Sequence, residues 1–137
     1  MKQDGVMVSS DGGTLPIKRK EDRPRRGHPH AYVNFPKVFR KYVREEKLLP
    51  LENAVRKMTS FSASFHQMKH GGLLAEGHKF DIVIFDPETV RHNATYSDSR
   101  QRSTGIEYVI VNGKISIENG EYNGALKGRV LLLTENK

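Results

Sequence analysis

The sequence of 137 residues contains no cysteine, which excludes disulfide bonds and thiolate metal sites within the chain. It also lacks an apolar run near the roughly 20 residues that a membrane-spanning helix needs. Its first 13 residues have no apolar core of the kind found in a signal peptide. We therefore expect a cytoplasmic protein without a membrane partner. The chain is too short for a (β/α)8 barrel, which needs roughly 250 residues.

Acidic residues are in the minority, with 16 Asp and Glu against 23 Lys and Arg, giving a formal charge of +7. Much of the excess lies in Lys18–Arg26. A basic cluster can contact nucleic acid. This one contains Pro24 and has neither interleaved aromatic residues nor a helical stripe that could enter a groove. We interpret it as a solvated loop, and nucleic acid is a disfavoured partner.

The first half of the chain predicts two amphipathic helices. Apolar residues at the helical spacing i, i+3, i+4, i+7 and i+8 are Phe35, Val38, Phe39, Tyr42 and Val43. Asn34 is the expected N-cap, and Pro36 suits an early helical position. A second helix is predicted to start near Pro50, with a stripe formed by Leu51, Ala54, Val55 and Met58. Ahead of both, Val6–Val8 predicts a short buried strand that ends in the polar turn Ser9–Gly13.

The second half predicts β-structure. Asp81–Pro87 has the pattern of a strand ended by a turn. Asn112-Gly113 joins two β-type runs and predicts a hairpin, because both turn positions need a positive φ. Asn119-Gly120 predicts another turn, and Val130–Leu133 a final strand. The chain thus divides near residues 66–72.

Each half lacks the partner that would cover its apolar side. A hairpin with a few isolated strands is marginal alone, and two helices with one short strand are not a complete domain. The pattern indicates a fragment of a larger fold.

A succession of short motifs runs along the chain. They are Ser10-Asp11-Gly12, His28-Pro29, Phe35-Pro36, Tyr42–Glu45, Leu51–Thr59, Gly72–Gly77, Asp81–Val90, Ala94–Tyr96, Gly105–Gly113 and Gly128–Leu131. This succession resembles D-aminoacylases, the N-acyl-D-amino-acid deacylases of the amidohydrolase superfamily. The resemblance spans roughly residues 5–133.

The resemblance implies an α/β fragment. Residues 1–65 would form the C-terminal end of a metal-dependent hydrolase TIM barrel, with its last strand at about residues 5–10. Residues 66–137 would form the C-terminal part of a β-sandwich. The expected partner is the missing N-terminal region of the barrel.

The chain departs from the family pattern at several positions. His30 stands where the family commonly has Arg after His-Pro. Val33–Lys37 replaces a Gly-Thr-Phe-Pro-Arg run, and Phe80-Asp81 replaces Ala-Asp. The loop between Asp11 and His28 is unusually basic. These departures bear on the substrate.

By the resemblance, Asp11 is the catalytic residue at the C-terminal end of the last barrel strand, where barrel active sites are assembled. Such enzymes use Zn²⁺ to acidify a water that attacks the amide carbonyl, and a carboxylate carries the proton to the leaving amine. Alternative interpretations of Asp11 are a metal contact or, from its motif alone, a turn residue. Ser10, Gly12 and His28 are candidate substrate contacts.

The histidines do not predict a metal site. His28 and His30 form an HxH pair, but a basic loop rather than an apolar strand precedes them. The remaining histidines, which we interpret as surface residues, are His66, His70, His78 and His92. A zinc site needs three or four protein ligands, so Zn²⁺ is expected only in the complete enzyme.

The predicted function is hydrolysis of a carbon-nitrogen bond in a linear amide, with an N-acyl-D-amino acid or a similar small amide as substrate. The chain alone is expected to be inactive. The alternative is a non-catalytic remnant of a deacylase or a basic binding module.

Overall fold

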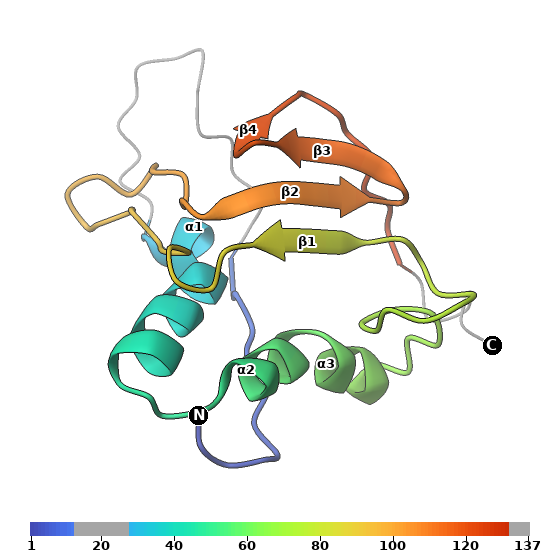
Figure 1. Cartoon of the computed structure of the whole chain (residues 1–137), viewed down its shortest axis with the longest axis horizontal. Helices are drawn as coiled ribbons and strands as arrows, with labels where there is room; N and C mark the ends of the chain where they lie inside the picture. The colour runs from blue at the N-terminus through green and yellow to red at the C-terminus, as the bar shows by residue number, and fades with distance from the viewer. Residues whose placement is uncertain (13–27, 132–137) are drawn as a thin grey trace.

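The computed structural model describes residues 1–12 and 28–131. Figure 1 shows helices on one side and a sheet on the other, with β1 the strand nearest the helices. The helices are α1 (His30–Lys37), the π-helix η1 (Val38–Glu45), α2 (Leu51–Met58) and α3 (Ser60–Phe65). The strands are β1 (Ile82–Phe85), β2 (Ile106–Val111), β3 (Lys114–Glu118) and β4 (Glu121–Tyr122). The basic cluster at residues 18–26 lies outside the described residues.

Helix α1 begins earlier than its sequence pattern predicted. The N–H of Tyr32 donates to the carbonyl of Pro29 at 2.9 Å, which starts the first turn. Pro29 occupies the N-cap position, and its missing N–H costs nothing at a helix start. Asn34 therefore lies inside the helix, and its predicted role as N-cap was wrong.

Pro36 lies near the end of α1 and has no N–H to donate to the preceding turn. The chain continues directly as η1, in which hydrogen bonds reach back five residues instead of four. The N–H of Glu46 accordingly donates to the carbonyl of Lys41 at 2.8 Å. Arg40 pairs with Glu45 at the same spacing, 2.8 Å apart. This hydrogen bond lowers the pKa of Glu45.

A small apolar core lies between η1 and α2. It consists of Val38, Leu49 and Ala54, with Val8 and Phe39 among the partly buried side chains around it. The predicted helix after Pro50 is confirmed as α2. Helix α3, which follows it at Ser60–Phe65, was not predicted. Within the described residues no helix is long and apolar enough to cross a membrane.

The sheet is antiparallel, with strand order β1-β2-β3-β4. The predicted hairpin is confirmed: Val111 pairs with Lys114, and Asn112 and Gly113 have φ of 48° and 71°. The turn at Asn119-Gly120 is also confirmed, with φ of 51° and 76°. Val130 and Leu131 belong to no strand, and the rest of the predicted final strand lies outside the described residues.

Contacts from η1 join the helices to the end of β1 and to the segment that follows it. The rings of Phe39 and Phe85 stack with centroids 4.7 Å apart. The Arg44 guanidinium donates to the carbonyls of Pro87 at 2.8 Å and Val90 at 3.0 Å. These contacts hold residues 85–90 against η1, and a hydrogen bond between Tyr96 and His28 brings the loop that follows Val90 to the start of α1.

Candidate functional site

Asp11 lies on an exposed turn beside the start of α1. Its φ of 46° is left-handed, a conformation that Asp adopts more readily than most residues. Gly12 follows it, and a Cβ on Gly12 would lie 3.1 Å from Cα of Ala31. A side chain at this position would crowd the helix, so Gly12 allows the turn to approach α1 closely.

The segment that leads to Asp11 is held by residues of the helices. The Asn34 amide nitrogen donates to the carbonyl of Ser10. The N–H of Val8 donates to the carbonyl of Lys57 at 3.4 Å. Residues 6–10 form no strand, contrary to the sequence prediction. The physical reason is that no strand among the described residues lies alongside them, so their backbone bonds go to helix residues instead.

His28, His30 and Tyr96 form a hydrogen-bonded group beside this turn. The Nδ1 atoms of His28 and His30 lie 2.7 Å apart, and the N–H of His30 also donates to Nδ1 of His28 at 3.2 Å. Nδ1 of His28 is thus the acceptor, which assigns the proton of its neutral ring to Nε2. Nε2 lies 3.1 Å from the Tyr96 hydroxyl oxygen. The hydroxyl accepts this bond and keeps its own hydrogen for another acceptor.

These three residues line a hollow of about 340 Å³ between α1 and the loop after β1. The other lining residues are Pro29, Val33, Asn34, Lys37, His92, Ala94 and Thr95. Among the described residues, the lining holds an ammonium, three imidazoles and a phenol, and no carboxylate. Its chemistry suits an anionic or hydrogen-bond-accepting ligand.

His92 is a half-buried member of this lining. Burial lowers its pKa, and the positive charges of Arg40 and Lys37 lower it further, while Glu45 acts in the opposite direction. Its Nδ1 is buried without a hydrogen-bond partner in the described part of the chain. The prediction of a surface histidine was therefore wrong for His92, because the loop after β1 folds back against the helices. His78 is likewise half-buried, whereas His66 and His70 are exposed as predicted.

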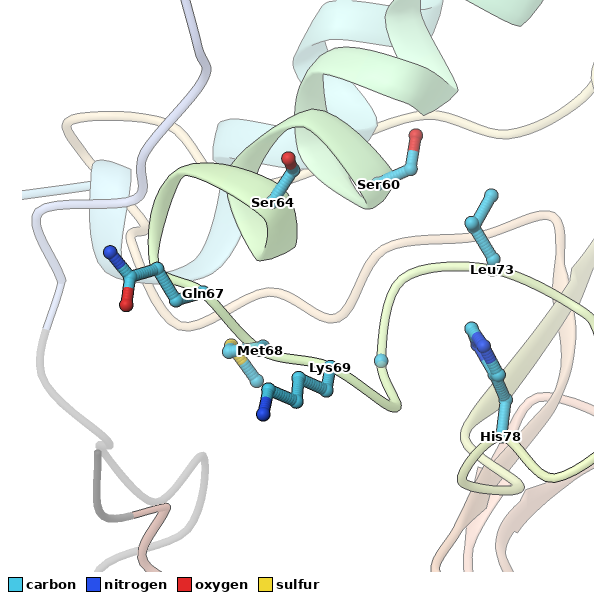
Figure 2. A pocket seen from close by; sticks show the side chains of 8 residues that line it. Ser60, Ser64, Gln67, Met68, Lys69, Leu73 and His78 are labelled. Atoms are coloured by element: carbon cyan, nitrogen blue, oxygen red, sulfur yellow. The ribbon is translucent and has the colours of Figure 1, made fainter. Parts of the chain in front are cut away.

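A second hollow, of about 430 Å³, lies between α3 and the loop that precedes β1. Figure 2 shows Ser60 and Ser64 on the helix, with Leu73 and His78 across the open space. The remaining lining residues are Gln67, Met68, Lys69 and Gly71. None of the predicted site residues lines it. The hollow beside Asp11 is therefore the better candidate site, although it is the smaller of the two.

The part of the chain that the structure describes does not contain a complete set of metal ligands. In residues 1–12 and 28–131, no three His, Asp or Glu side chains come together as a metal-binding group. His28 and His30 are adjacent, but their Nδ1 atoms face one another in a hydrogen bond. These residues do not by themselves fit the three or four ligands that zinc requires.

The site contains residues that the sequence pattern did not single out. Tyr96 was noted only within the motif Ala94–Tyr96, Lys37 only as the end of the run Val33–Lys37, and His92 only as a surface histidine. Their role depends on the packing of the loop after β1 against α1. The motif at Ala94–Tyr96 was the one available indication, because it places an aromatic residue in an otherwise polar stretch.

The candidate site combines an exposed acidic turn with a hollow that suits an anionic ligand, and comparison with known proteins gives the family of the chain. The model of the amidohydrolase family matches residues 22–117, so the chain belongs to the amidohydrolase family. Several of its relatives are named as deacylases of D-amino acids, as the resemblance indicated. The D-aminoacylase of Alcaligenes xylosoxydans xylosoxydans is 39% identical over 129 residues, which are 94% of this chain and 25% of that protein. The N-acyl-D-aspartate deacylase of the same organism is 43% identical over 105 residues, covering 76% and 21%.

Solved structures agree with these relatives. A D-aminoacylase crystal structure matches with a TM-score of 0.74 at 39% identity, covering 77% of this chain and 22% of that one. The N-acyl-D-glutamate deacylase of Bordetella bronchiseptica, complexed with zinc and a phosphonate inhibitor, matches with a TM-score of 0.73 at 38% identity, covering 83% and 22%. The chain thus spans between a fifth and a quarter of the length of these relatives.

Proposed function

We propose that this chain is part of a hydrolase that acts on carbon-nitrogen bonds in linear amides and removes the acyl group from an N-acyl-D-amino acid. The observation that carries the proposal is the position of Asp11, on an exposed left-handed turn between Ser10, which bonds to Asn34 of the hollow, and Gly12, which lies against His30 of the hollow. The relatives named as deacylases of D-amino acids support the substrate class.

In this proposal Asp11 moves the proton of the reaction. Its carboxylate accepts a proton from the attacking water and returns it to the leaving nitrogen, so that the amine departs neutral. General acid–base catalysis of this kind contributes about 10²–10⁴-fold to a rate. The exposure of Asp11 supports this role, because a proton shuttle must reach both the water and the substrate nitrogen.

His28 and the hollow beside it are proposed to receive the substrate, with Ser10 and Gly12 at the turn. Every N-acylated amino acid has a carboxylate. The Lys37 ammonium and the hydroxyl hydrogen of Tyr96 are donors that suit such a group.

The proposal extends to the cofactor and to the rest of the fold, with the zinc-bound structure of one relative as support for the metal. We propose that zinc serves the complete enzyme, with its other ligands outside this chain and Asp11 close to it. Residues 1–65 would end the barrel and residues 66–137 would belong to the β-sandwich. The rest of the barrel would come from the missing N-terminal region.

The experiment places this chain in the Alcaligenes D-aminoacylase, where it replaces the segment that it matches. The chimera is assayed with N-acyl-D-amino acids and zinc. We expect turnover, and we expect Asp11→Asn to lower kcat by at least about 10²-fold. The control is Asp4→Asn, an exposed aspartate in the same segment, which should keep kcat.

Two results would overturn the proposal. One is a chimera with Asp11→Asn that retains its kcat, since a neutral amide cannot accept the proton. The other is robust turnover by the 137-residue chain alone with added zinc, because the proposal requires residues outside this chain for the reaction.

A further inference from the structure

Lys57 on α2 is among the least exposed large side chains, with 2% of its surface accessible. Its ammonium donates to the carbonyl oxygens of Gln3 at 2.5 Å, Asp4 at 3.3 Å and Val6 at 3.0 Å. A buried cation is unfavourable unless its donors are hydrogen-bonded. The three donors of an ammonium match these three acceptors, all of which belong to the segment that leads to Asp11.

The backbone of Lys57 binds the same segment. Its carbonyl accepts the N–H of Val8 at 3.4 Å, and also the hydroxyl of Ser62 at 3.0 Å. One helical residue therefore bonds to four backbone groups between residues 3 and 8. Because this stretch belongs to no helix or strand, the side chain and the carbonyl of Lys57 supply partners that secondary structure would otherwise give.

Asn34 on α1 holds the other end of the segment. Its amide nitrogen donates to the carbonyl of Ser10. That carbonyl and the N–H of Asp11 belong to one planar peptide unit, so fixing one fixes the other. The bond thus anchors the backbone directly before the left-handed turn at Asp11.

We propose that Lys57 and Asn34 form a two-point clamp on residues 3–12 that fixes the backbone on which Asp11 is presented beside the hollow. Both are positioning residues, because each acts through a bond to the backbone that carries Asp11. Lys57 sets the path of the segment at its start, and Asn34 sets the plane of the peptide that precedes Asp11. The catalytic consequence of the clamp rests on the proposed function, whereas its structural consequence does not.

The structural test measures backbone order by NMR in the 137-residue chain. Rigid amides have order parameters near 0.85 and flexible ones below about 0.6. We expect Asn34→Ala and Lys57→Met to lower the order parameters of Asp11 and Gly12 into the flexible range while the amides of α2 keep theirs. The control is Asn123→Ala, which removes an equivalent bond from an asparagine amide to a backbone carbonyl, that of Ile115 at 2.9 Å, in the β part.

Unchanged order at Asp11 in both variants would overturn the clamp, as would an equal loss after Asn123→Ala. If Lys57→Met unfolds the whole chain, Asn34→Ala decides the question, because Asn34 is not one of the core residues.

The catalytic test uses the chimera. Displacing a catalytic group by about 1 Å can cost 10²-fold in rate, so we expect Asn34→Ala and Lys57→Met each to lower kcat by about that factor. KM should be nearly unchanged in Lys57→Met, because Lys57 does not line the hollow. A change confined to KM would contradict a positioning role. If instead Asp11→Asn keeps its kcat while Asn34→Ala still loosens Asp11, the clamp stands and the proposed function fails.

Discussion

The helical part, residues 1–12 and 28–65, and the β part, residues 66–131, are held together by different means. In the helical part the bonds that position the site connect residues far apart in sequence: Lys57 reaches the carbonyl of Gln3, and Asn34 reaches Ser10. In the β part each strand pairs with the next one along the chain. The bonds that position the site therefore join helices to a segment without regular structure, whereas β2, β3 and β4 pair across short turns and only β1 reaches its partner over a longer stretch, from Ile82 to Ile110.

The two parts also differ in how much of their apolar surface is buried. The apolar core of Val38, Leu49 and Ala54 belongs to the helical part. In the sheet, Val83 and Ile84 on β1 remain about half exposed. Apolar burial is the main favourable term in folding, so stability should be more sensitive to the core of the helical part than to exposed apolar residues of the β part.

The largest effect is expected from Leu49→Ala. Leu49 is 7% exposed, and removing a buried leucine side chain costs about 3 kcal/mol, through lost burial and the cavity left behind. The matched control in the β part is Leu126→Ala, where the side chain is 89% exposed and the change should be within about 0.5 kcal/mol. Urea unfolding followed by far-UV circular dichroism measures both. Equal losses would contradict the difference between the two parts.

A smaller but clear effect is expected from Gly105→Ala, which tests where the β part is tightly packed. Gly105 has φ of 78°, and an added Cβ would lie 2.5 Å from the backbone of Val90. Overpacking costs about 1–3 kcal/mol. Gly77→Ala is the control, because its φ is also 78° and nothing in the described part of the chain lies within 4 Å of the added atom.

The difference between the two glycine variants isolates the steric contact from the cost of the left-handed backbone. We expect Gly105→Ala to lower the free energy of unfolding by about 2 kcal/mol more than Gly77→Ala. Thermal or urea unfolding of the two chains would give the value. If the two variants have the same free energy of unfolding, the loop at Val90 moves away from the added Cβ at little cost. It would then not be held firmly enough to shape the hollow.

Local patterns predicted most of the regular structure. Asn112-Gly113 predicted its hairpin because two adjacent residues with positive φ are typical of a two-residue turn between antiparallel strands. The stripe from Val38 to Val43 identified a helix because side chains of that spacing share a face. The start of α1 was misplaced because His28 and Pro29 supply the first turn through their carbonyls, which the pattern of apolar residues does not show.

The site was predicted only in part. Asp11 and His28 stood within motifs, whereas Lys57, Asn34 and Tyr96 acquire their roles from contacts that cross 24 to 68 residues of sequence. The strand at Val6–Val8 failed for a related reason, since a strand needs a neighbour, and the described residues supply helix groups instead. A pattern of apolar residues predicts which face is buried but not which backbone groups a buried lysine will bind.

The smallest effect on stability is expected from protonation of His92, which lies where the helical part and the β part meet. Burial and the charges of Arg40 and Lys37 lower its pKa below the usual 6.5. The unfolded chain thus binds a proton more readily than the folded one as the pH falls through 6.5, and stability declines with it. Glu45 and Asp86 also have lowered pKa values, but their contributions are lost only at lower pH, below their ordinary values of 4.5 and 3.8.

We therefore expect the urea midpoint of the 137-residue chain to fall between about pH 7 and about pH 5, and His92→Gln to reduce that fall. Glutamine has no proton to gain in this range and can still donate and accept hydrogen bonds. His66→Gln is the matched control, because His66 is exposed at the end of α3; it should leave the dependence on pH unchanged. If His92→Gln gives the same fall as the parent chain, then the loop after β1 does not hold His92 against the helices, and the two parts are less closely joined than Arg44 and the aromatic stack indicate.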